Sequence, residues 1–185
     1  MGFKSSYKLS TIFETPFYRI RLFQPADAEG IFLLDSDPEV HQFLGNKPIK
    51  TMSEAEKIVA YIMGQYEKNG VGRWAIIEKA SQEFVGWTGL KYEDVLRPGQ
   101  PYYDLGYRLR RKFWGRGIAS LTAKMSVDYG FETLGYAAIG GAADIRHAVS
   151  NHVLQKSGLK FVDTFEYKGE PHYWYNLKRE EWLAQ

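Results

Sequence analysis

The sequence predicts a mixed α/β domain in which helices cover both faces of one sheet. Some segments alternate apolar and polar residues with the period of a strand, whereas others repeat apolar residues at the 3.6-residue spacing of a helix. The two kinds follow one another as strand, two helices, three strands, helix, strand, helix and two strands. This order is typical of a mixed sheet sandwiched between helices.

The first third of the chain predicts one strand and two helices. Residues 18–22 alternate apolar and basic side chains, as expected of a half-buried strand. Pro25 suits the first turn of a helix, which should end before Pro38 because the residue preceding a proline avoids helical geometry. Thr51 and Glu54 form a capping-box pattern at the start of a second helix, which an Asn-Gly pair ends.

The middle of the chain predicts three strands, a turn and a helix. Residues 73–78 and 84–92 read as two strands joined by a short turn. Residues 103–109 alternate most clearly, with Tyr and Leu on one face and Asp, Gly and Arg on the other. The turn at 112–117, KFWGRG, follows directly, and helical spacing resumes at Ile118.

The last third predicts a strand, a helix and a hairpin. The strand lies near 136–141, and the helix runs from about 145 to 156 before Gly158 ends it. Residues 161–167 and 172–177 pair across a Lys-Gly-Glu turn as a final hairpin.

Length and composition predict a single domain over residues 1–185, with a core at about 17–178 and a loosely held segment at 1–13. Hydrophobic residues make up 44% of the chain, which is enough for a packed core. A formal charge of +2 is too weak to favour a nucleic-acid partner. The chain has no cysteine, which excludes disulfides and cysteine-bound metals.

The sequence shows one short pattern for membrane attachment and no other membrane-targeting signal. No apolar run approaches the roughly 20 residues that span a bilayer, and the first residues lack the apolar stretch of a signal peptide. Gly2 and Ser6 match the M-G-x-x-x-[ST] pattern of myristoylation, but an unmodified segment explains the same residues. We therefore expect a cytoplasmic protein with no membrane partner.

The turn at 112–117 has the features of an anion site. The first N–H groups of a helix have no partner within it and carry partial positive charge. Gly115 and Gly117 let an anion approach the backbone closely. Four cations surround them, namely Arg110, Arg111, Lys112 and Arg116. A pyrophosphate would fit here; the alternative is a basic surface turn whose glycines serve only its geometry.

Several segments around this turn resemble the GNAT N-acetyltransferases. Gly106 and Tyr107, followed by 114–119, are similar to the family's acetyl-CoA-binding core. Residues 150–158 resemble the N-x-x-S-x-x-x-x-x-K-x-G-F signature of the RimJ/RimL-like branch, the ribosomal-protein N-terminal acetyltransferases and their relatives, and 85–90 resemble the strand before the core. The resemblance implies a three-layer α/β/α acyl-CoA N-acyltransferase fold, with a mixed, mostly antiparallel central sheet.

The resemblance also implies an enzyme that binds acetyl-CoA and transfers the acetyl group directly to an amine. The main chain of 109–111 would hold the pantetheine arm, and 114–120 the pyrophosphate. A backbone N–H near Leu109 would stabilise the oxyanion that forms from the thioester. The expected cofactor-binding residues are Leu109, Arg110, Arg111, Lys112, Trp114, Gly115, Arg116, Gly117, Ile118, Ala119, Ser120, His147 and Ser150.

Three positions depart from the family pattern. Lys112 stands where glutamine or arginine is usual, yet it keeps a backbone N–H and a positive charge. His147 occupies the place of the branch's asparagine, which bears on one pantetheine contact. Leu154 stands where many members have a tyrosine that protonates the leaving thiolate, so this route is closed here.

The candidate catalytic residues follow from the need for a neutral amine. A peptide α-amine, with a pKa of about 7.7–8.0, is roughly 10–20% neutral at pH 7, whereas a lysine amine is roughly 0.04% neutral. An α-amine therefore needs only a weak base. Asp104 and Glu93 are the candidate bases, and Ser150 is the candidate for orienting substrate or protonating the thiolate. Solvated strand charges and a serine bonded to its own helix are the structural alternatives.

The sequence leaves three functions open. The first is acetylation of a protein or peptide N-terminal α-amine, and the second is acetylation of a small amine such as an aminoglycoside, polyamine or amino acid. The third is a non-catalytic acyl-CoA sensor. We expect no metal site, because His147 and His152 lie about 140° apart around a helix. We expect the protein to be a monomer or a homodimer. Six aromatic residues are candidates for lining an acceptor groove, with burial in the core as the alternative: Trp74, Trp87, Tyr102, Tyr103, Trp174 and Tyr175.

Overall fold

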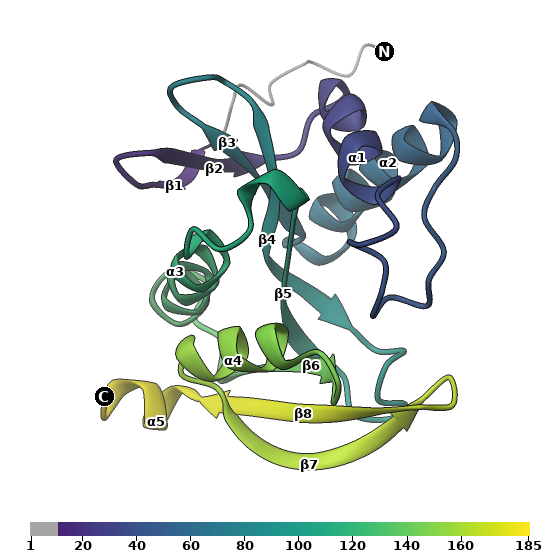
Figure 1. The fold of residues 1–185 in the computed structure, drawn as a ribbon. Helices are drawn as coiled ribbons and strands as arrows, with labels where there is room; N and C mark the ends of the chain where they lie inside the picture. The colour runs from purple at the N-terminus through teal and green to yellow at the C-terminus, as the bar shows by residue number, and fades with distance from the viewer. Residues whose placement is uncertain (1–10) are drawn as a thin grey trace.

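One eight-stranded sheet organises the chain (Figure 1). The computed structural model describes residues 11–185, so the pattern at Gly2 and Ser6 lies outside the described residues. The strands are β1 (Thr11–Glu14), β2 (Tyr18–Leu22), β3 (Arg73–Glu78), β4 (Phe84–Glu93), β5 (Tyr102–Leu109), β6 (Ala138–Asp144), β7 (Lys160–Tyr167) and β8 (Glu170–Lys178). The helices are η1 (Pro25–Asp27), α1 (Ala28–Asp35), α2 (Met52–Asn69), η2 (Arg111–Phe113), α3 (Ile118–Glu132), α4 (Ala148–Lys156) and α5 (Arg179–Leu183).

The sheet is mixed and mostly antiparallel. Its strand order is β1-β2-β3-β4-β5-β6-β8-β7. Every neighbouring pair runs antiparallel except β5 and β6, which run parallel. This architecture confirms the predicted fold class. Among residues 11–185, no helix combines the length and the apolar character that crossing a membrane requires.

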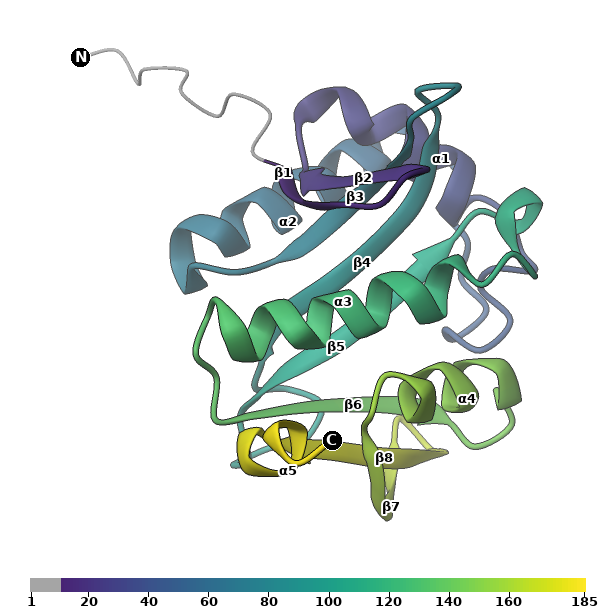
Figure 2. The same cartoon turned by 90° about the vertical axis from the view of Figure 1, so that its left-hand side faces the viewer.

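Helices cover both faces of the sheet (Figure 2). On one face, α1 and α2 pack against Ala75, Ile77 and Phe84. On the other face, α3 and α4 pack against a second set of strand residues that includes Trp74 and Ile76. Neighbouring residues of β3 thus point to opposite cores, as the alternation of a strand requires. Below, the α1/α2 face and the α3/α4 face are named after these helices.

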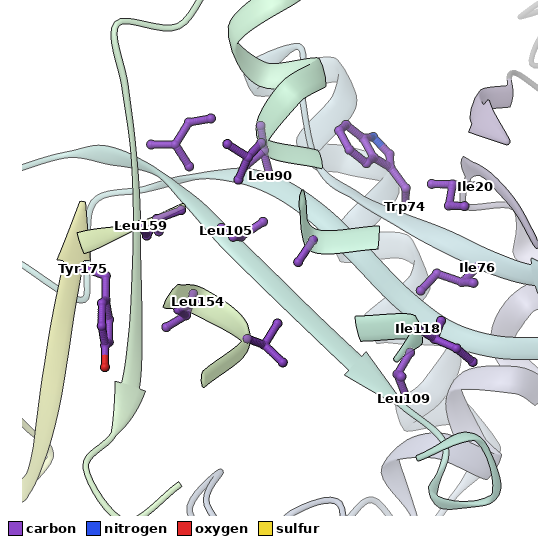
Figure 3. Close-up of a cluster of buried hydrophobic side chains, with 14 of the residues drawn as sticks. Ile20, Trp74, Ile76, Leu90, Leu105, Leu109, Ile118, Leu154, Leu159 and Tyr175 are labelled. Carbon is purple, nitrogen blue, oxygen red and sulfur yellow. The ribbon is translucent and has the colours of Figure 1, made fainter. Parts of the chain in front are cut away.

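The core on the α3/α4 face fixes the position of β5 (Figure 3). Leu105 and Leu109 of β5 are buried in it, beside Ile118 of α3 and Leu154 of α4. Leu154, at the family's tyrosine position, is 1% exposed and packs over Gly141, where an added side-chain carbon would lie 2.7 Å from its Cδ2. Leu154 is therefore a packing residue, and the end of β5 is held rigidly by its apolar neighbours.

Most predicted elements lie where the sequence placed them. The capping box of α2 is confirmed, since the Glu54 N–H donates to the Thr51 hydroxyl and the Thr51 N–H donates to the Glu54 carboxylate at 2.9 Å. The helix predicted from residue 145 begins instead at Ala148, because the Asp144 carboxylate accepts the Arg146 N–H in a turn. Strand β6 extends to Asp144, and β1 and α5 were not predicted.

Candidate functional site

The site forms where β5 and β6 separate (Figure 2). The two strands are in register only at Asp104 and Gly140, and beyond that pair β5 continues to Leu109 without β6 beside it. The N–H of Arg110 donates to Val85 of β4. Because successive N–H groups along a strand point to alternate sides, the N–H of Leu109 faces the side that β6 has left. An oxyanion at this point would meet an available main-chain donor.

The turn after β5 presents a second set of main-chain donors. Gly115 and Gly117 both have a φ of +73°, which disfavours other residues. A side-chain carbon added to either glycine would meet no atom within 4 Å, so the space beside this backbone is open. Gly117 is the N-cap of α3, whose first N–H groups lack intrahelical partners. The turn fits a pyrophosphate, and its neighbours Ile118, Ala119 and Ser120 begin the helix.

The four cationic side chains of the turn form ion pairs or hydrogen bonds with other groups of the protein. The Lys112 ammonium lies 2.6 Å from the Glu83 carboxylate, and Arg111 Nε lies 3.0 Å from Asp37. Arg110 and Arg116 donate to main-chain oxygens, those of Phe84 and Lys112, both at 2.9 Å. Trp114 Nε1 donates to the Leu109 carbonyl at 2.8 Å, which ties the turn to the end of β5. Main-chain N–H groups, with Arg116 as the least neutralised cation, are thus the donors at this turn that the protein's own groups leave most available to an anion.

A pair of hydroxyl groups links β5 to α4. The Tyr107 hydroxyl donates to the Ser150 carbonyl at 2.7 Å and lies 3.0 Å from Ser150 Oγ. Burial raises the pKa of Tyr107, so the phenol keeps its proton at neutral pH. Ser150 therefore has a partner across the strand separation. Tyr107 was not predicted as a site residue, although it belongs to the Gly-Tyr pair that marked this strand.

The resemblance to acetyltransferases predicts that the leaving thiolate accepts a proton near Ser150. Replacing Tyr107 with phenylalanine is therefore expected to lower kcat about tenfold, because the phenol bonded to Ser150 is lost while Ser150 remains. Acetyl-CoA affinity, measured by calorimetry, should stay unchanged. Tyr103→Phe is the matched control, since Tyr103 lies on the same face of β5, four residues earlier. A wild-type kcat in Tyr107→Phe would remove the phenol from the proton path.

His147 and Asn151 shape the start of α4. The Asn151 side-chain amide donates to the carbonyls of Asp144 and His147 at 2.9 and 3.0 Å, and its oxygen accepts from Tyr175 at 3.0 Å. These bonds fix α4 to β6 and β8. The His147 ring stacks on Phe43, which lies between α1 and α2, with centroids 4.4 Å apart. Burial lowers the pKa of His147, which keeps the imidazole neutral at pH 7.

Asp104, the first candidate base, lies at the separation of β5 and β6 and faces the α1/α2 side. Its carboxylate pairs with Arg73, whose Nη1 also donates to the Asp104 carbonyl at 2.6 Å and to Gly89. The guanidinium crosses beside Gly106, where an added side-chain carbon would lie 2.5 Å from it. Burial raises the pKa of Asp104, and the Arg73 charge opposes that shift. The carboxylate is only 13% exposed and is not a free charge.

Glu93, the second candidate base, lies at the far end of β4. It pairs in register with Tyr102, the first residue of β5, so it is distant along the strand from the site at Leu109. Its carboxylate lies 2.6 Å from the Lys91 ammonium and accepts the N–H groups of Val95 and Leu96. Although burial acts to raise it, these partners together hold the pKa of Glu93 below its ordinary value. The residue organises the loop after β4.

A second buried carboxylate lies on the α1/α2 face. Asp35, at the end of α1, accepts a hydrogen bond from Arg108 Nη1 at 2.7 Å and lies 3.5 Å from His41 Nε2. Neither ring nitrogen of His41 has a hydrogen-bond partner within residues 11–185. Burial, followed by the nearby Arg108 charge, lowers the pKa of His41. Arg108 Cζ also sits 5.2 Å from the centre of the Trp87 ring. No signal in the sequence connected these residues.

The aromatic residues divide between core and surface. Trp74 and Tyr175 are each 2% exposed and belong to the core on the α3/α4 face. Tyr102 and Trp174 meet edge to face, with centroids 4.4 Å apart, above Gly140 on the α1/α2 face. Trp174 is buried, and Tyr102 and Trp87 are half-buried, so these three rings form a partly covered apolar layer beside the separated strands.

Comparison with known proteins identifies the family. Residues 18–160 match the acetyltransferase (GNAT) domain family. The chain is 29% identical over 150 residues to an uncharacterised N-acetyltransferase of Bacillus subtilis, covering 80% of this chain and 82% of that protein. It is 32% identical over 163 residues to the FsC-acetyl coenzyme A-N(2)-transacetylase of Aspergillus fumigatus, covering 81% of this chain and 68% of that protein.

A solved structure shares the fold. The ribosomal-protein-S5-alanine acetyltransferase of Vibrio fischeri superposes with a TM-score of 0.73 at 17% identity, covering 92% of this chain and 97% of that chain. An acetyltransferase family, unlike a sensor, requires both a bound acyl-CoA and a second substrate. The chain belongs to the GNAT acetyltransferases and is an acetyl-CoA-dependent N-acetyltransferase.

Proposed function

We propose that acetyl-CoA lies along the end of β5 and the turn that follows it. The main chain of 109–111 holds the pantetheine arm, and the N–H groups of 114–120 hold the pyrophosphate. His147 and Ser150 border the arm from α4, while Lys112 and Arg116 add charge beside the phosphates. The open space at Gly115 and Gly117 supports this placement. The N–H of Leu109 receives the thioester oxygen as it becomes an oxyanion.

The proposed acceptor is the α-amine of a protein or peptide, as in the RimJ/RimL-like branch. One observation carries this proposal: both candidate bases, Asp104 and Glu93, are held by cations. A carboxylate paired with a cation is only a weak base, which suits an amine that is already partly neutral at pH 7, as an α-amine is. The motif at Ser150, and the alanine acetyltransferase named among the similar structures, support the same branch.

The proposed reaction is direct transfer within a ternary complex. The neutral amine nitrogen bonds to the thioester carbon, and the carbonyl oxygen becomes an oxyanion beside Leu109. Collapse of this intermediate re-forms the carbonyl and breaks the carbon–sulfur bond. Asp104, whose pKa burial raises, takes the proton lost by nitrogen through a water molecule. The Tyr107 and Ser150 hydroxyls give a proton to the CoA thiolate and recover one from solvent, to which Asp104 releases the proton that it took from nitrogen.

A small-molecule amine is the second candidate acceptor. The relative at 32% identity is named for N(2)-transacetylation with acetyl coenzyme A, in a protein that this chain covers over 68% of its length. Asp104 and Asp35, the carboxylates beside the separated strands on the α1/α2 face, are each paired with an arginine, which argues against a polycation among such small amines.

An acceptor panel tests the proposal. Thiol release from acetyl-CoA is measured with alanyl and seryl peptides, the same peptides with blocked N-termini, a lysine side-chain amine, spermidine and a free amino acid. We expect turnover with free α-amines that exceeds turnover with the lysine amine by at least about a hundredfold at pH 7, following their neutral fractions. Preferential turnover of spermidine or of the lysine amine would refute the α-amine proposal.

A further inference from the structure

Arginine side chains on the α1/α2 face differ in how many of their donors the protein uses. Arg73 donates to Gly89 and to both the carbonyl and the carboxylate of Asp104. Arg97 makes a two-pronged contact with Asp163 and lies over the Trp174 ring. These two guanidinium groups are therefore committed to holding strands and loops together.

Arg108 differs from Arg73 and Arg97. Within residues 11–185, Nη1 is the only one of its nitrogens that donates a hydrogen bond, and the acceptor is Asp35. A guanidinium carries five N–H donors, so four of them make no hydrogen bond to the described residues. The side chain is 23% exposed, so part of the group is open to a ligand. Asp35 on one side and the Trp87 ring on the other hold the group in place.

The backbone position of Arg108 places these donors beside the reaction. Arg108 directly precedes Leu109, whose N–H faces the separated strands, and adjacent Cα atoms lie about 3.8 Å apart. Side chains alternate along β5, so Tyr107 points to the α3/α4 face and Arg108 to the α1/α2 face. The cofactor turn and the α4 contacts occupy the α3/α4 side. The acceptor amine therefore approaches from the face that Arg108 occupies.

We propose that Arg108 selects acceptors by hydrogen-bonding the carbonyl oxygen next to the reacting amine. In an amino acid or peptide, this oxygen is bonded to the second carbon from the α-nitrogen, so it arrives with the amine. A planar donor group held in advance suits such an oxygen and gains nothing from a simple alkylamine. The inference rests on the proposed α-amine function and names Arg108 as its specificity-determining residue.

The test compares two acceptors of similar size, alanine N-methylamide and sec-butylamine, in the full chain. For Arg108→Gln, kcat/KM with the amide should fall about tenfold, mainly through KM, because one charged hydrogen bond is lost. With sec-butylamine it should stay within about twofold. Arg108→Lys keeps the charge beside Asp35 and should show the same selectivity loss. Arg19→Gln, an exposed arginine paired with Glu14, is the matched control.

The outcomes separate this inference from the function on which it rests. An equal loss with both acceptors means that Arg108 only supports the fold, and it overturns the inference. Unchanged kinetics with the amide in both Arg108 variants overturn it as well, while the α-amine function stands. If the wild-type chain prefers sec-butylamine, or accepts neither compound, the proposed function fails and the role of Arg108 fails with it.

Discussion

Replacing Gly117 with glutamate is expected to abolish acetyl-CoA binding, with at least about a hundredfold loss of affinity from two or more charge-assisted hydrogen bonds. Gly117 is the N-cap of α3 and has a φ of +73°. A carboxylate there would occupy the open space beside the helix N-terminus and repel the pyrophosphate. Calorimetric titration with acetyl-CoA measures the loss.

The matched control for this substitution is Gly99→Glu. Gly99, in the loop between β4 and β5, has a φ of +78°, and an added side-chain carbon there would also meet no atom within 4 Å. The two variants therefore carry the same new charge and a similar backbone strain. Gly99→Glu should bind acetyl-CoA as the wild type does. Comparable melting temperatures with normal binding by Gly117→Glu would disprove the placement of the pyrophosphate.

Replacing Asp104 with asparagine is expected to lower kcat by about a hundredfold or more, which is the range of a lost general base. Acetyl-CoA affinity should change little, because Asp104 faces the α1/α2 side of the sheet. The basis is the position of Asp104 where β5 and β6 part and the burial that raises its pKa. The acidic limb of the pH profile should keep the part set by the amine's own pKa and lose the part that belongs to Asp104.

A structural role for Asp104 predicts a different result, because its substitution leaves the Arg73 guanidinium buried without a counter-charge. Asp27→Asn removes an equivalent counter-charge elsewhere, since Asp27 pairs at 2.7 Å with the buried Arg21 of β2, three strands from β5 in the sheet. Both variants should lose thermal stability. Only Asp104→Asn should lose turnover per folded molecule; an equal loss in both would assign Asp104 to the scaffold.

Local patterns predicted the elements whose signals are local. Strand β3 begins and ends at the predicted residues, 73 and 78, and the capping box of α2 forms as expected. Strand β6 was placed less well, because its small residues carry no alternation. Positions 140 and 141 have no room for a side chain, because Trp174 and Leu154 pack directly over Gly140 and Gly141. These packing partners lie elsewhere in the chain. The sequence pattern cannot show such a requirement before the fold is known.

The candidate site also contains one part with a local sequence signal, the glycine turn, and one part made of side chains that are distant in the sequence. The glycine turn is contiguous, so its chemistry could be predicted from the residues alone. Tyr107 and Ser150 are 43 positions apart, and Arg108 and Asp35 are 73 apart. Both pairs depend on the separation of β5 from β6 and on the helices that cover each face. Asp104 was predicted as a lone carboxylate, whereas its partner Arg73 comes from a strand two positions away in the sheet.

The single register pair between β5 and β6 has a consequence for how this protein tolerates mutation. The donors that it leaves at Leu109 belong to the peptide backbone, which every residue except proline provides. Side-chain changes along β5 can alter packing or acceptor preference, but they cannot delete these donors. The proposed oxyanion donor at Leu109 is thus kept when residues on the α1/α2 face are substituted, and a change of acceptor preference does not require that donor to be rebuilt.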